Sequence, residues 1–326
     1  DHTELPEGSL ETLSSLKMIT CDYIQLDMLR LALGDAAKGL ERLNASHLKG
    51  LEELSYFPGL KSLEMEDCRE ISDIYALAQV KDLENLKLYD MDEVNDFTVL
   101  NVLKKLRSLS IDAENLKDIS FINHMPELAS LGITDSKILL LDPLVGKESL
   151  KELVLVDNGE VRDYNPVGTL TGLETLVINK YTSQEDPDLT ALTGLKHGEF
   201  HGMMGIRFLG SLTGLEELKV QGCNVDQPSV IASLPALKKL TYRKNWGNSD
   251  DLSFLAGCQG LTCLDMNHSE FYGDVSYAFN LPALETLILD SSSFEVKFDR
   301  LQDNPALKAL SLNHVKLYKN IEMWSD

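Results

Sequence analysis

The apolar residues of this chain follow one short pattern that returns about every 22 residues. The pattern is LxxLxL, as in LKSLEM from Leu60, LETLVI from Leu173 and LKALSL from Leu307, and other apolar residues also occupy its last position. Neighbouring copies begin 20–24 residues apart. The clear copies begin at Leu60, Leu83, Leu106, Leu128, Leu150, Leu173, Leu195, Leu215, Leu237, Leu261, Leu284 and Leu307, and two weaker copies begin at Leu16 and Leu40. This spacing predicts about fourteen turns of one repeating unit.

Within each copy, apolar and polar residues alternate as they do in a half-buried strand. The apolar residues at motif positions four and six should point inward, and positions three, five, seven and eight should point to solvent. A single turn cannot bury its own leucines, so stacked turns should share one parallel sheet over a continuous core. The copy from Leu195 has Gly198 at a leucine position, and we expect Met203 and Met204 to fill the space that it leaves.

The second half of each repeat begins with an aspartate followed by an apolar residue. A carboxylate at this place can accept backbone N–H groups at the start of a short helical turn. The connection between strands has about 16 residues or fewer, which favours 3-10 turns and short helical pieces over long helices. The aspartates concerned are Asp73, Asp96, Asp118, Asp163, Asp251 and Asp274.

These residues resemble the leucine-rich repeat family, and the LxxLxLxxN-x-I-x-D-I pattern is most similar to its internalin-like bacterial subclass. The resemblance covers about residues 40–315 and reaches more weakly back to Leu16. It implies an α/β fold, a leucine-rich repeat solenoid shaped as a curved horseshoe. One parallel sheet would form its concave face, and short 3-10 or helical turns would form its convex face.

The family usually has asparagine at the ninth motif position, where the amide bonds to the backbone of neighbouring turns. In this chain Asn158 and Asn245 keep that residue. Most other copies have a different residue there, among them Cys68, Ser136, Cys223, Ser269 and Ser292. The asparagine ladder is therefore expected to be mostly lost.

The ends of a solenoid need separate cover because they would otherwise expose the core. We expect an N-terminal cap with a degenerate first repeat at residues 1–39, a repeat domain at 40–315 and a C-terminal tail at 316–326. The apolar stretch from Tyr23 to Gly34 predicts a helix that covers the first turn. No apolar run approaches the ~18 residues that span a bilayer, so no membrane insertion is expected.

The net charge of the chain argues against some classes of binding partner. The chain has 30 Lys and Arg against 52 Asp and Glu, and its formal net charge of −22 disfavours binding to nucleic acid. Residues 51–100 contain 13 acids and 4 bases, whereas residues 201–250 contain 4 acids and 6 bases. A concave face polarised in this way would orient a protein partner of mixed charge. Ordinary solvation of an exposed sheet explains the same residues equally well.

The residues expected to contact a protein partner lie at positions seven and eight of their copies or in the loop that follows. Tyr89 and Trp246 are candidate aromatic anchors, together with Tyr181, although Trp246 could instead pack over its own turn. The predicted contact set is Tyr89, Asp112, Asp135, Asn179, His201, Arg243, Trp246 and Asn267.

One strand has residues that suit a metal ion. His197, Glu199 and His201 alternate, so all three should face the same side and could bind zinc or copper, with Glu217 of the next turn as a fourth ligand. Lys219 should lie beside Glu199 and could simply pair with it. No nucleophile, metalloprotease or phosphate-loop motif is present, so we predict no catalytic residues, no metal and no cofactor.

The five cysteines are odd in number and have no CxxC spacing, which favours reduced thiols over a disulfide framework. Cys21, Cys68 and Cys223 fall at interior positions of the repeat, where buried thiols are expected.

The function predicted from the sequence is a non-enzymatic, monomeric module that binds a protein partner on its concave face. The resemblance, and a chain that begins at Asp1 without an initiator methionine, favour a secreted or surface-held bacterial protein. Two alternatives stay open: a metal-binding protein or hydrolase that uses His197, Glu199 and His201, and an intracellular scaffold.

Overall fold

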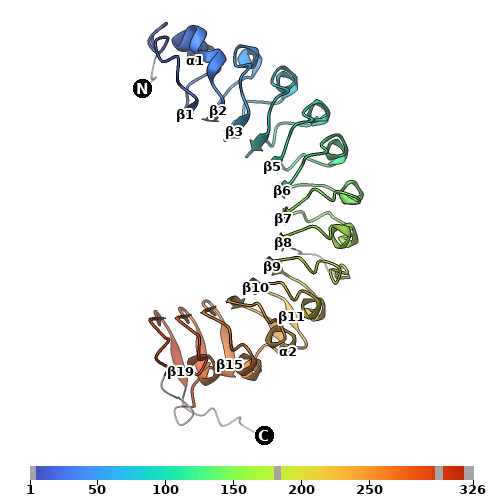
Figure 1. Ribbon diagram of the computed structural model, residues 1–326, viewed down its shortest axis with the longest axis vertical. Coiled ribbons are helices and arrows are strands. Elements are labelled where there is room, and N and C mark those ends of the chain that lie inside the picture. Colours follow the sequence, from blue (N-terminus) through green and yellow to red (C-terminus); the bar gives the residue numbers. More distant parts are fainter. Residues whose placement is uncertain (1–4, 180–184, 298–303, 319–326) are drawn as a thin grey trace. The chain divides into compact units, whose positions relative to one another are not determined.

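The computed structural model describes residues 5–179, 185–297 and 304–318. The chain forms two compact units, Asp1–Pro166 and Val167–Asp326. In each unit a parallel sheet lies on one side and short helical turns lie on the other (Figure 1). We call the solvent-facing side of each sheet its sheet face. None of the helices in the described ranges has the length and apolar character needed to cross a membrane.

In the first unit, the strands of the sheet lie side by side in chain order, because each turn of the repeat adds one strand beside the last. The strands are β1 (Met18–Asp22), β2 (Arg42–Ser46), β3 (Ser62–Glu66), β4 (Asn85–Leu88), β5 (Ser108–Asp112), β6 (Ser130–Thr134) and β7 (Glu152–Val156). The outer row contains α1 (Leu26–Leu33), η1 (Gly34–Gly39), η2 (Glu52–Tyr56), η3 (Tyr75–Gln79), η4 (Thr98–Val102), η5 (Ser120–His124) and η6 (Asp142–Leu144).

The second unit repeats this plan. Its main sheet contains β8 (Thr175–Asn179), β9 (His197–His201), β10 (Glu217–Gln221), β12 (Lys239–Arg243), β14 (Cys263–Asp265), β16 (Thr286–Ile288) and β18 (Ala309–Ser311). The helical segments are η8 (Arg207–Ser211), α2 (Ser229–Ala232), η9 (Leu252–Gly257) and α3 (Ser276–Phe279), and η7 (Asn165–Thr169) contains the boundary between the units.

The second unit also has small parallel sheets that the sequence did not predict. They form where the chain becomes extended again just after the turn that ends a main strand. One sheet pairs β11 (Asn224–Val225) with β13 (Trp246–Gly247), and the other contains β15 (Glu270–Asp274), β17 (Ser293–Glu295) and β19 (Lys316–Tyr318).

The strand register confirms the predicted core. Leu63 of β3 lies opposite Leu43 of β2 and opposite Leu86 of β4, so equivalent leucines of successive turns stack directly on one another. All three leucines are at most 1% exposed. The residues between them face solvent, as the alternation predicted. The leucine-rich repeat solenoid expected from the sequence is therefore the fold of the chain.

The aspartates of the outer row act as predicted. In each case the carboxylate accepts the backbone N–H of the residue two positions further on, which fixes the first bend of the helical turn. These bonds run to Asp73 from Tyr75, to Asp96 from Thr98, to Asp118 from Ser120, to Asp163 from Asn165, to Asp251 from Ser253 and to Asp274 from Ser276.

The N-terminal helix differs from the prediction in its start and its place. Helix α1 begins at Leu26, because Tyr23 takes a left-handed backbone conformation (φ 57°) that a helix cannot contain. The helix lies in the outer row beside η2 (Figure 1) and buries Leu26, Leu29 and Leu33. It is thus the helical segment of the first turn.

Motif position eight is the point at which the chain leaves the strand, and it is left-handed in most turns. The non-glycine residues with positive φ have values between 45° and 57°. Aspartate, histidine and glycine tolerate this conformation better than most residues, which explains why they recur at this position. The residues are Tyr23, His47, Asp67, Asp90, Asp135, Asp157, Lys244, His268, Ser291 and His314, with Gly202 and Gly222.

Side chains at motif position nine still form hydrogen bonds between turns, although few of these residues are asparagines. Serine and cysteine side chains make the same type of contact as the asparagine amide, each donating to a backbone carbonyl of an earlier turn. The contacts are Asn158 to Ile133 (2.8 Å), Asn245 to Val220 (3.1 Å), Ser292 to Met266 (2.9 Å) and Cys223 to Phe200 (3.3 Å).

The space beside Gly198 is filled by Phe200, and not by the methionines that the sequence suggested. A Cβ atom on Gly198 would lie 2.7 Å from Cε2 of the Phe200 ring. Phe200 is fully buried and packs edge-on against Phe208, with ring centroids 5.0 Å apart. Met203 is buried but is not among the nearest contacts at Gly198, and Met204 is 46% exposed.

All five cysteines are free, as predicted. Cys21, Cys68 and Cys223 are buried in the repeat interior, and Cys258 is buried beside the outer row. Burial raises the pKa of the Cys21 and Cys223 thiols to about 11 and that of Cys258 to about 12, which keeps these thiols protonated and unreactive.

Candidate functional site

The sheet face of the first unit is acidic around Asp112, at the end of β5. The hydroxyl of Thr134 donates to its carboxylate at 2.9 Å. Burial raises the pKa of Asp112, and the nearby carboxylates of Asp135 and Asp90 raise it further. Tyr89, at motif position seven of the preceding turn, is partly exposed. Three predicted contact residues of this unit, Tyr89, Asp112 and Asp135, therefore belong to successive turns on one face.

In the second unit, Arg243 and Asn267 are held by a shared carboxylate. Asp265 forms an ion pair with Arg243 and accepts the backbone N–H of Asn267 at 3.0 Å. The Nε of Arg243 and the Oδ1 of Asn267 have no hydrogen-bond partner among the described residues. Both atoms are buried, so Asp265 holds these two residues in place without their unpaired atoms being presented to solvent.

The strand that suggested a metal ion forms ion pairs with the next turn. As predicted, Glu217 lies level with His197 and Lys219 lies beside Glu199. The Lys219 ammonium contacts Glu199 at 3.1 Å, and Lys239 contacts Glu217 at 2.6 Å. Each carboxylate of the supposed ligand set therefore already has a lysine partner.

His201 approaches the same carboxylate, with its Nε2 3.8 Å from Oε2 of Glu199. The His201 imidazole and the Lys219 ammonium lower the pKa of Glu199 to about 2, so this carboxylate is charged at neutral pH. Within the described ranges, no group of three or more His, Cys, Asp or Glu side chains is placed to hold a metal ion.

Two predicted contact residues lie in places that the sequence pattern did not indicate. Asn179 ends β8 and is only 8% exposed, so its side chain belongs to the packed edge of the sheet. Trp246 lies beyond the left-handed turn at Lys244, in β13, which pairs with β11 and not with the main sheet. Trp246 is 48% exposed, and it is therefore accessible beside the sheet face. Tyr181 lies outside the described residues.

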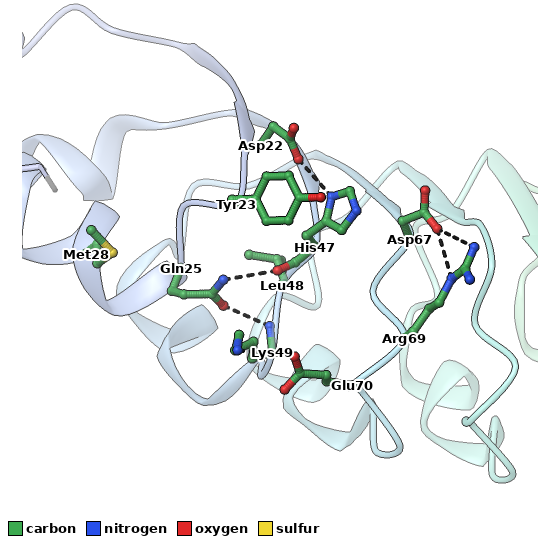
Figure 2. A pocket seen from close by; sticks show the side chains of 10 residues that line it. All are labelled: Asp22, Tyr23, Gln25, Met28, His47, Leu48, Lys49, Asp67, Arg69 and Glu70. Carbon is green, nitrogen blue, oxygen red and sulfur yellow. Dashed lines mark hydrogen bonds and ion pairs between the residues drawn. The ribbon is translucent and has the colours of Figure 1, made fainter. Parts of the chain in front are cut away.

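A hollow of about 990 Å³ opens near the start of the first unit, at residues that the sequence reading did not select (Figure 2). It lies along the left-handed turns that follow β1, β2 and β3. Its lining residues are Asp22, Tyr23, Gln25, Met28, His47, Leu48, Lys49, Asp67, Arg69 and Glu70.

Two aromatic rings that line this hollow are stacked on one another (Figure 2). The rings of Tyr23 and His47 lie 3.9 Å apart between centroids, with 16° between their planes. Oδ1 of Asp22 contacts His47 Nδ1 at 2.8 Å and accepts the Ser46 hydroxyl at 2.7 Å. These contacts fix the imidazole, and the Ser46 hydrogen bond in particular lowers the pKa of Asp22, so that Asp22 is a carboxylate at neutral pH.

The polar groups around the stack are mostly engaged with one another (Figure 2). Gln25 donates to the carbonyl of His47 at 3.0 Å and accepts the backbone N–H of Lys49 at 2.8 Å. Arg69 pairs with Asp67 at 2.8 Å, and Lys49 pairs with Glu70 at 3.2 Å.

One local signal could have drawn attention to this hollow. Tyr23 occupies the position at which later turns have aspartate, glycine, histidine, serine or lysine. A left-handed conformation at a bulky residue costs about 1–3 kcal/mol. Tyr23 is therefore a bulky, exposed residue at a place where most turns have a residue that tolerates this conformation better. The group as a whole can bind a ligand through ring and carboxylate, and it includes no activated nucleophile.

Comparison with known proteins places the fold in a class. No protein-family model matches the chain, and a search of curated proteins finds no significant match. Solved structures do match, and they include an internalin and a leucine-rich repeat protein. The chain therefore has the fold of this class.

An internalin of Listeria monocytogenes aligns over 88% of this chain and 84% of its own, with a TM-score of 0.69 and 23% identity. A leucine-rich repeat protein of Leptospira interrogans aligns over 91% and 89%, with a TM-score of 0.57 and 15% identity. The Toll–Spatzle complex of Drosophila contains a chain that aligns over 92% of this one and 46% of its own, with a TM-score of 0.61 and 15% identity. The predicted likeness to internalins thus holds for the fold.

Proposed function

We propose that this chain is a non-enzymatic module that binds a protein partner through the sheet faces of its repeats. The observation that carries the proposal is the division of strands such as β5 into buried apolar residues and solvent-facing polar residues. Leu109 and Ile111 of β5 are fully buried, whereas Ser108, Ser110 and Asp112 face solvent on a backbone held by strands on both sides. Side chains ordered before binding lose little entropy when a partner contacts them.

The charges on the two sheet faces favour a partner of mixed charge. Asp90, Asp112 and Asp135 make the face of the first unit acidic. The face of the second unit has charges of both signs, because Lys219 and Arg243 are each paired with a carboxylate. Charge complementarity of this type increases association rates and fixes the orientation of a partner more than it increases affinity. Each unit would contact its own part of the partner.

The similar structures support the same class of function. The Drosophila structure is a complex of Toll with Spatzle, and the plant structure that also matches is a receptor-kinase ectodomain in complex with Casparian strip integrity factor 2. The receptor-kinase match is an ectodomain, and we propose that this chain is likewise a secreted or surface-held protein. We propose that the chain acts as a monomer and needs no cofactor.

Photo-cross-linking from two matched tyrosines tests the proposal. Tyr89 lies on the sheet face of the first unit, and Tyr75 lies in η3 of the outer row and is 52% exposed. Each tyrosine is replaced separately by benzoylphenylalanine, and each variant is irradiated with host and bacterial surface extracts. We expect one protein to be captured from position 89 and not from position 75.

The captured protein is then titrated against Arg243→Ala and Asp112→Asn variants, which should bind it more weakly than the parent chain. Capture of the same protein with equal yield from position 75 would overturn the role of the sheet face. Absence of any cross-link from position 89 would overturn it as well.

A further inference from the structure

We propose that the hollow beside β1 and β2 takes an arginine side chain of a protein partner, with the guanidinium stacked on Tyr23 and its charge paired with Asp22. This inference rests on the proposed function in one respect: it assumes that the arginine belongs to a protein partner. The site lies next to the sheet face, and none of the predicted contact residues lines it.

The shape of the hollow offers one free aromatic face. Tyr23 is 66% exposed, and the stack with His47 covers one side of its ring. A planar guanidinium stacks well on such a face and is attracted to the negative potential of the ring. None of the described arginine or lysine side chains lies over Tyr23.

The carboxylate beside the ring is open to solvent on one side. The contacts of Asp22 with the Ser46 and His47 side chains are both made by Oδ1, which accepts from Ser46 and contacts His47. The side chain of Asp22 is 60% exposed. Arg69 and Lys49 pair with other acids, so among the described residues that line the hollow only the His47 imidazole can offset the charge of Asp22, and only when it is protonated.

The first unit contains an internal example of the same recognition. The guanidinium of Arg30 lies over the ring of Tyr56, 4.7 Å from its centroid, and its Nε forms an ion pair with Glu53 at 2.7 Å. Arg30 is thus held between a tyrosine ring and a carboxylate. Tyr23 and Asp22 present the same two groups to solvent.

The backbone at Tyr23 also argues for a binding role. Its φ of 57° lies in the left-handed region, which asparagine and glycine adopt with less strain. A purely structural turn would be better served by either residue. Tyr23→Asn therefore separates folding from binding, because asparagine keeps the turn and removes the ring.

The test uses N-acetyl-arginine amide as the probe and the histidine ring signals of the full chain as the readout. Protein with ¹³C-labelled histidine is titrated by NMR, and the His47 signal is assigned from a His47→Gln variant. His124, in η5, serves as an internal reference away from the hollow. N-acetyl-citrulline amide, which has nearly the same shape and no charge, is the matched control ligand.

We expect the arginine probe to shift the His47 signal saturably at millimolar concentration, with no saturation for citrulline and no shift at His124. Tyr23→Asn and Asp22→Asn should each weaken binding by at least about fivefold, and Tyr23→Phe should bind as the parent does. Tyr23→Asn should unfold at the same denaturant concentration as the parent or a higher one.

Equal shifts with arginine and citrulline, or unchanged arginine binding by Tyr23→Asn, would overturn the proposal. Equal binding of N-acetyl-lysine amide would overturn the assignment to a planar guanidinium. The proposed function fails separately, since cross-linking from position 89 does not involve Tyr23 or Asp22. Arginine binding without cross-linking would leave this site standing and remove the sheet face as the contact surface.

Discussion

Restoring the repeat consensus at Gly198 should destabilise the protein. Leucine occupies the equivalent place in both neighbouring strands, since Gly198 lies opposite Leu176 of β8 and Leu218 of β10. A consensus argument from the sequence would therefore predict that Gly198→Leu stabilises the fold. The structure predicts the opposite, because the ring of Phe200 already fills the place of the missing side chain.

The contact distances set the size of the effect. A Cβ on residue 198 would lie 2.7 Å from Cε2 and 3.1 Å from Cζ of Phe200, closer than carbon atoms pack. The ring would have to move, and its edge-on contact with Phe208 would be lost. Overpacking of this type costs about 1–3 kcal/mol. With a urea m-value of about 2 kcal/mol/M, a loss of about 2 kcal/mol lowers the unfolding midpoint by about 1 M.

Urea unfolding of four proteins provides the assay. The parent, Gly198→Leu, Phe200→Leu and the double variant form a double-mutant cycle, followed by circular dichroism and tryptophan fluorescence. Both single variants should unfold at lower urea, the first through overpacking and the second through the cavity beside Gly198. The double variant, which reads LKHLEL, should recover most of the loss. A urea midpoint of Gly198→Leu equal to or above that of the parent would refute the assignment of Phe200 to this space. Additive effects of the two single variants would show that residues 198 and 200 do not compete for the same space.

Three further predictions follow from burial and charge. Leu176→Ala should cost about 2–5 kcal/mol because Leu176 is fully buried, whereas the outward Val177→Ala should cost much less, and similar urea midpoints for the two variants would contradict the strand register. Glu199→Gln should lower stability slightly at neutral pH. The low folded pKa of Glu199 stabilises the protein above the ordinary value of 4.5, and this contribution disappears as the pH falls to about 2, where the variant and parent should unfold alike. Asp112→Asn should raise stability at neutral pH, because the raised pKa of Asp112 means that its charge destabilises the folded state there. The difference from the parent should vanish below the ordinary Asp pKa of 3.8, where the side chain is protonated in both the folded and the unfolded state. Denaturation midpoints measured from neutral to acidic pH check both signs, and parallel pH profiles for parent and variant would exclude either assignment.

Features that depend on one turn of the repeat could be predicted well from sequence. The buried leucines, the aspartates that start the outer turns and the interior cysteines recur at fixed distances from the motif. Each of these positions has the same neighbours in every turn, so local spacing determines its environment. The pairing of Glu199 with Lys219 followed from the same rule, applied to two adjacent strands.

Features that depend on how a particular turn departs from the repeat could not be predicted in this way. Asn179 is buried although its motif position usually faces solvent, and Trp246 lies in a separate two-stranded sheet. Serine and cysteine replace the bonds between turns that asparagine usually makes. Each outcome depends on distances between atoms of different turns, and the sequence pattern contains no such distances.

The candidate sites show the same division. Periodicity alone indicated which side chains of the sheet face solvent, because alternation along a strand is a property of the extended backbone. The stack of Tyr23 on His47 beside Asp22 required the folded chain, since it joins residues 24 or 25 positions apart through two left-handed turns. The sequence by itself therefore determined the repeat and the orientation of its side chains. The tertiary structure alone decided which of those side chains meet, because that depends on the three-dimensional packing of one turn on the next.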